Sequence, residues 1–144
     1  MNDKRLPTCL AFLLCEAVTY DTTTSKHTLV GLLSDVRARA FPLTCPELVA
    51  YHELTGEQGS VSVALLLARL LDLPEAPAGR RSAVTLSAWR YPATVIRSPE
   101  VVVKIAITLR DLSFPEPGDY AFVLEVDGTP LMVRGFEARL LEHP

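Results

Sequence analysis

The sequence predicts an all-β protein, a single-domain antiparallel β-sandwich of about seven to eight strands. Apolar residues alternate strictly with others between Val101 and Leu109, which is typical of a strand with one buried face. A Pro-Glu-Pro-Gly corner and an Asp-Gly pair then divide the following chain into further strands. Turn signals recur along the rest of the chain at the spacing expected of a sandwich.

The apolar pattern of the N-terminal half predicts several strands. Both faces are apolar from Cys9 to Cys15, so this segment is expected to be a central strand covered on both sides. The polar stretch 21–26 predicts a turn, and 27–33 a returning strand with a bulge at Gly31. Shorter apolar runs predict two more strands, over residues 36–41 and 48–54.

Residues 61–73 fit two structures. Val61, Val63, Leu65 and Leu67 alternate as in a strand, whereas the leucines that follow also form a helical stripe. The hairpin-like neighbours favour a strand, and one short helix within 61–73 remains the alternative. A Pro- and Gly-containing stretch, 74–82, predicts a surface loop before a short strand at 84–89.

The C-terminal part predicts an antiparallel meander over residues 101–140. Phe114 to Tyr120 form a rigid corner, because two prolines fix φ and remove backbone donors. Asp127-Gly128 is a strong hairpin signal. Pro130 has no N–H group to donate, so the strand over 129–134 is expected at a sheet edge.

Composition limits the possible classes of protein. The chain has 144 residues, which predicts one domain spanning 1–144, and its 49% hydrophobic content can fill a core. The net charge of −3 argues against a non-specific nucleic-acid binder. The uncharged run from Leu6 to Cys15 contains Pro7 and has Leu14 where signal cleavage needs a small residue. No run is long enough to span a membrane, and we expect a cytoplasmic protein with reduced thiols.

Several motifs together resemble a small, uncharacterised bacterial family of unknown function. They are Cys15-Glu16 at the end of the first strand, Leu29 to Asp35 leading to Phe41-Pro42, the Phe-Pro-x-Pro-Gly-x-Tyr corner at 114–120, and Asp127-Gly128. The resemblance covers residues 9–42 and 101–135 and implies a β-sandwich. It brings no activity, cofactor or catalytic residue.

No pattern predicts a catalytic or metal centre. The three cysteines and three histidines lack the ligand spacing of a zinc site. There is no Gly-x-Ser-x-Gly elbow, and Gly56 to Gly59 lack the lysine of a phosphate-binding loop. We therefore expect no enzyme activity and no cofactor.

Charge is distributed unevenly along the chain. The basic segment 76–99 contains no acid, and the segment 111–128 contains no base. The possible interaction surface consists of Arg80, Arg81, Trp89, Arg90, Tyr91 and Arg97. Such residues are enriched at protein interfaces, and they also stack on nucleic-acid bases. They can equally be solvated surface, or pair with the acidic segment within or between subunits.

The sequence thus predicts a non-enzymatic protein-interaction or self-association module of unknown biological role. A protein partner, or a second copy of the chain, would bind through an exposed sheet edge, with no nucleic acid and no membrane involved. The alternative is a β-sandwich that binds a small molecule or carbohydrate through Trp89, Tyr91 and the nearby arginines.

Overall fold

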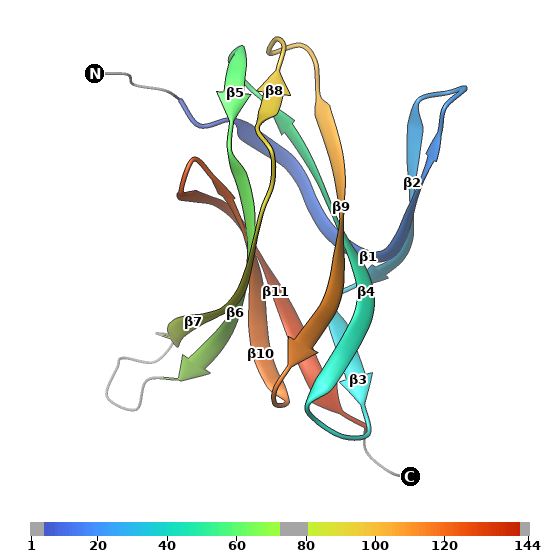
Figure 1. The fold of residues 1–144 in the computed structure, drawn as a ribbon, viewed down its shortest axis with the longest axis vertical. Coiled ribbons are helices and arrows are strands. Elements are labelled where there is room, and N and C mark those ends of the chain that lie inside the picture. Colours follow the sequence, from blue (N-terminus) through green and yellow to red (C-terminus); the bar gives the residue numbers. More distant parts are fainter. Residues whose placement is uncertain (1–4, 73–80, 142–144) are drawn as a thin grey trace.

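The computed structural model describes residues 5–72 and 81–141, and within these ranges the protein is all-β (Figure 1). Eleven strands and no helix are found in the described residues. They are β1 (Thr8–Asp21), β2 (Lys26–Leu33), β3 (Asp35–Ala38), β4 (Leu43–Thr55), β5 (Gly59–Val61), β6 (Val63–Asp72), β7 (Arg81–Arg90), β8 (Thr94–Ile96), β9 (Val103–Phe114), β10 (Gly118–Val126) and β11 (Thr129–Leu140). The described residues therefore include no helix that is long and apolar enough to cross a membrane.

Two large sheets pack face to face, which confirms the predicted β-sandwich. Sheet A has the order β2-β1-β4-β9 and is antiparallel. Sheet B has the order β3-β11-β10-β6-β7, and only its β3–β11 pair is parallel. The short strands β5 and β8 form a separate pair at one end of the molecule (Figure 1).

The core consists of alternate residues from the inner faces of both sheets. Leu48, Ala50 and Leu54 point inward from β4, and Leu109 does so from the neighbouring strand β9. Aromatic rings fill the end of the sandwich near the corner between β9 and β10: Phe114, Tyr120, Phe122 and Phe136 are all buried and contact one another. Large side chains of this kind supply most of the hydrophobic stabilisation of a small sandwich.

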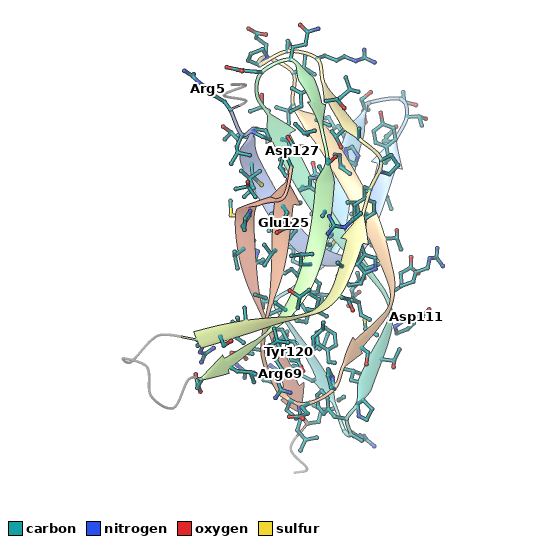
Figure 2. All side chains as sticks on the ribbon, turned by 60° about the vertical axis from the view of Figure 1, so that its left-hand side comes forward. Arg5, Arg69, Asp111, Tyr120, Glu125 and Asp127 are labelled. Atoms are coloured by element: carbon teal, nitrogen blue, oxygen red, sulfur yellow. The ribbon has the colours of Figure 1, made fainter. Side chains whose placement is uncertain are left out.

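The corner at 114–120 connects the two sheets. Tyr120 is fully buried, and its hydroxyl group donates a hydrogen bond to the backbone oxygen of Glu116, 2.5 Å away. Figure 2 shows Tyr120 beside Arg69 toward one end of the sandwich, with Glu125 and Asp127 toward the other. Arg69 forms an ion pair of 2.8 Å with Glu116, so the corner is fixed to β6 as well.

The β1–β2 hairpin bends over the outer face of sheet A. Gly31 has a φ of +67°, and a Cβ atom there would lie 2.7 Å from Cδ of Glu16 on the facing strand. Beyond this bend, the ring of His27 lies 5.6 Å from the ring of Tyr51 on β4. Cys15 of β1 is fully buried, whereas Leu10 earlier on the same strand is exposed. The central, covered position predicted for residues 9–15 is therefore wrong for residues 9–13, which β2 does not reach.

Several local predictions are confirmed, and others need correction. β1 and β2 pair without a register shift, so the predicted bulge at Gly31 is wrong. The predicted loop 74–82 lies outside the described residues except for Arg81 and Ser82, which belong to β7. Residues 61–72 form strands and contain no helix, and Asp127 and Gly128 have the positive φ values of a tight hairpin. The strand count is higher than about seven to eight, because β5 and β8 have only three residues each and leave no periodic pattern. β3 overlaps the strand predicted over 36–41 but ends earlier, at Ala38. The meander over 101–140 is wrong, because β9 belongs to sheet A and β10 to sheet B.

Candidate functional site

The structure does not gather the predicted surface residues into one site. Arg80 lies outside the described residues. Arg90 and Arg97 are exposed, whereas Trp89 is half-buried and packs against the core. Tyr91 is half-buried as well and lines an apolar cleft beside β9. Trp89 and Arg90 are neighbours on β7 and therefore face opposite sides of sheet B, whereas Tyr91 and Arg97 lie beyond the end of this strand.

Arg81 lies in a charged groove on the outer face of sheet B. Its Nη1 atom is 2.6 Å from Oδ2 of Asp119, and its Nε atom is 3.1 Å from Oδ1 of Asp72. The groove has a volume of about 460 Å³, and two more internal ion pairs line it, Arg37 with Asp35 and Arg139 with Glu137. Arg81 therefore pairs with an acid within its own chain, which was one of the alternatives for the uneven charge.

A more unusual feature is the side of the sandwich where β1 faces β11, here called the seam. β2 pairs with β1 only from Leu14 onward, and β3 pairs with β11 only from Glu137 onward. Residues 8–13 of β1 and 129–136 of β11 therefore have no neighbouring strand on this side among the described residues. The predicted edge position of the strand containing Pro130 is confirmed.

The two unpaired edges are bridged by one side chain. Nε of Arg134 donates a hydrogen bond of 3.1 Å to the backbone oxygen of Phe12. A groove lies on each side of this bridge, with volumes of about 400 and 300 Å³. Arg134 is the one charged side chain among the described residues that line these grooves.

Large apolar side chains surround the seam. Leu10 is 52% exposed and Val133 is 59% exposed, and both line the larger groove. Leu32 is 63% exposed and lines the smaller one. Sequence reasoning found the edge through Pro130 but missed Leu10 and Leu32, because the apolar pattern of the N-terminal strands predicted burial. Exposed apolar residues along an unpaired edge are suited to contact another polypeptide.

The thiols and imidazoles in the described residues show no arrangement for nucleophilic catalysis. Cys9, Cys15 and Cys45 carry free thiols, and burial raises the pKa of each. A catalytic cysteine needs a lowered pKa instead. His52 is fully buried, and neither ring nitrogen has a hydrogen-bond partner among the described residues.

Comparison with known proteins gives a fold and a family. No curated protein matches the chain. A similar solved structure is the Pseudomonas fluorescens alkylpurine DNA glycosylase AlkC bound to DNA containing an abasic site analog, with 12% sequence identity and a TM-score of 0.51. The match covers 74% of this chain and only 27% of that chain, and at this identity it shows a shared fold alone. The model of a family of unknown function, DUF6941, matches residues 10–138. The chain therefore belongs to the DUF6941 family.

Proposed function

We propose that this protein is a non-enzymatic interaction module that associates with a second copy of itself through the seam. The observation that carries the proposal is the pair of unpaired strand edges, residues 8–13 of β1 and 129–136 of β11. An unpaired edge presents a row of backbone N–H and C=O groups that another strand can satisfy. Two identical chains usually associate around a two-fold axis, and such an axis would place the two β11 edges antiparallel to each other.

The seam carries fewer charges than another edge of the sandwich. β9 carries Lys104, Arg110 and Asp111 along its length, and Asp111 has a φ of +55°. Charges and backbone irregularities of this kind keep edges from pairing. Residues 129–136 of β11 contain only one charged residue, Arg134, and the irregularities there, Pro130 and a register shift against β10, are confined to the start of the strand. The exposed side chains of Met132 and Val133 add apolar area to this edge.

The other edge of sheet B provides the comparison. β7 has a register shift against β6 between Leu67 and Ala68 and carries the exposed residue Val84. Val84 and Val133 are the same residue type on opposite edges of one sheet, with exposed fractions of 46% and 59%. Substituting each valine in turn shows which of the two edges takes part in association, without changing the core.

Sedimentation velocity over about two decades of protein concentration tests the proposal. We expect a concentration-dependent dimer. Val133→Glu should raise the dissociation constant of this dimer by at least about tenfold, because a carboxylate buried in the interface without a partner is costly. Val84→Glu should leave the dissociation constant unchanged. A chain that stays monomeric, or a dimer that Val84→Glu breaks and Val133→Glu does not, would contradict the proposal.

We also propose that nucleic acid is not a partner. The solved structure with the shared fold is a glycosylase bound to DNA, but it resembles this chain at 12% identity. The net charge here is −3, and Arg81 of the basic segment is already paired with Asp119. A DNA-binding surface needs arginines and lysines that neutralise phosphates, which this arrangement does not favour.

A further inference from the structure

A second concave feature lies on the side of the sandwich opposite the seam. It is a cleft of about 500 Å³ between the edge of sheet A and the chain that follows β7. Val103, Ile105 and Ile107 of β9 form one wall, while Tyr91 and Val95 contribute to the other. In Figure 1 these segments face one another as β9 and β8. The volume lies within the range of small-molecule sites.

The chemistry of the cleft is apolar and uncharged. No charged side chain is among the described residues that line it. Its most buried polar residue is His52, which extends inward from the central strand β4 between Phe12 and Ile105 on the neighbouring strands. An ionic ligand would find no countercharge here, so desolvation would disfavour it.

His52 offers hydrogen-bonding groups that the protein leaves unused. It is 0% exposed, and its Nδ1 and Nε2 atoms have no partner among the described residues. Burial lowers the pKa of His52 to about 4, so the ring is neutral near pH 7. A neutral imidazole has one donor and one acceptor. Leaving both unsatisfied costs free energy that a ligand group could recover.

Tyr91 places a second unused group in the same cleft. Its backbone N–H group donates to the oxygen of Val63 at 3.1 Å, which fixes the residue against β6. Its hydroxyl oxygen is buried and has no hydrogen-bond partner among the described residues. Burial raises the pKa of Tyr91 to about 12, so this group is a neutral donor and acceptor.

We propose that the cleft binds a small uncharged molecule with an apolar body and a hydroxyl or carbonyl group, for which His52 and Tyr91 supply hydrogen bonds. The branched side chains of Val103, Ile105 and Ile107 contact the apolar body. Alcohols, phenols and ketones have this chemistry. The site shares no side chain with the seam, so ligand binding can be tested independently of self-association.

Two probes that differ by one hydroxyl group test the proposal. 4-Ethylphenol and ethylbenzene are titrated by isothermal calorimetry into the full chain, into Tyr91→Phe, and into Tyr20→Phe as a matched control on the exposed hairpin. We expect the wild-type chain to bind 4-ethylphenol about five- to tenfold more tightly than ethylbenzene, which corresponds to one recovered hydrogen bond. Tyr91→Phe should reduce this preference by at least about threefold, and Tyr20→Phe should keep it.

The position of the site is tested separately. Ile105→Trp fills the cleft and should abolish binding of both probes, whereas Arg110→Trp on the exposed face of the same strand should not. The imidazole ¹⁵N resonances of His52 should move when 4-ethylphenol is added, and those of His27 should not. Absence of binding by the wild-type chain, equal binding of the two probes, or a preference that survives Tyr91→Phe would overturn the proposal. If Ile105→Trp does not fold, the probe preference of Tyr91→Phe and the ¹⁵N resonances of His52 still test the position of the site.

Discussion

Tyr120 stabilises the inter-sheet corner through both its ring and its hydroxyl group. The ring packs edge-to-face on Phe114 with centroids 5.1 Å apart, and the hydroxyl group donates to the oxygen of Glu116. We expect Tyr120→Phe to cost about 1 kcal/mol of unfolding free energy, because it removes only the hydrogen bond. Tyr120→Ala should cost about 3–5 kcal/mol, because it also leaves a cavity.

Denaturant melts of both variants measure these differences, and Arg90→Ala serves as the control. Arg90 is exposed, so its truncation should change stability by less than about 0.5 kcal/mol. A Tyr120→Ala variant as stable as Arg90→Ala would contradict the role given to the corner.

His52 should make stability depend on pH. Its pKa is lowered from 6.5 to about 4 by burial, so the unfolded chain takes up a proton at higher pH than the folded chain. The contribution to stability is therefore complete above about pH 6.5 and is lost as the pH falls toward 4, by about 3 kcal/mol in all. His52→Leu lacks this titration.

Urea melts of the wild-type chain and of His52→Leu at pH 7, 5.5 and 4 check this prediction. Carboxylates titrate in both proteins, so only the difference between them reports on His52. Parallel loss of stability in the two proteins would show that His52 titrates normally in the folded state.

The β1–β2 hairpin depends on the glycine at its bend. At Gly31 the φ of +67° disfavours any side chain, and an added Cβ atom would also displace the side chain of Glu16. We expect Gly31→Ala to lower the unfolding free energy by about 1–2 kcal/mol. Gly135→Ala is the control, because a Cβ there meets no atom within 4 Å. Gly135 lies on the seam, so both variants are measured at protein concentrations at which the chain is monomeric, and there Gly135→Ala should leave stability unchanged or slightly higher. In thermal melts, Gly31→Ala should therefore lower the melting temperature, and Gly135→Ala should leave it unchanged or raise it slightly.

At the scale of strands, local chemistry was readable from the sequence and partner choice was not. The alternation in β9, the proline corner and the Asp127-Gly128 hairpin are set by neighbouring residues, and all three were predicted. The move of the chain from sheet A to sheet B at the corner depends on which faces are buried by distant strands. β4 and β9, which pair over eleven residue positions, are far apart in the sequence. Periodicity carries no information about such pairing.

The candidate sites were harder to predict for the same reason. The seam joins residues near position 12 to residues near position 134, and only Pro130 signalled its edge. The cleft joins His52 to Tyr91 and Ile105, of which the sequence singled out Tyr91 alone. His52 stands in a run of apolar residues, where a lone histidine has no pattern of its own. Spacing along the chain could not reveal either combination.

For the whole molecule, the charge distribution predicts the absence of DNA binding. The net charge is −3, and Arg37, Arg81 and Arg139 on the outer face of sheet B are each paired with an acid of the same chain. We expect no saturable change in the fluorescence anisotropy of a labelled duplex at protein concentrations up to about 100 μM, where non-specific binders already bind. Saturable, salt-sensitive binding would show that unpaired arginines elsewhere form a basic surface.

The parallel pairing of β3 with the end of β11 has a consequence for synthesis of the chain on the ribosome. β3 ends at Ala38, but its partner residues, Glu137 to Leu140, are made only after all the other described strands of both sheets. Sheet B therefore cannot close until residues 137–140 have emerged from the ribosome, long after β3 has been made. A stop codon after Gly135 would leave β3 without its partner, and the nascent product should be degraded faster than the full-length chain in a pulse-chase experiment.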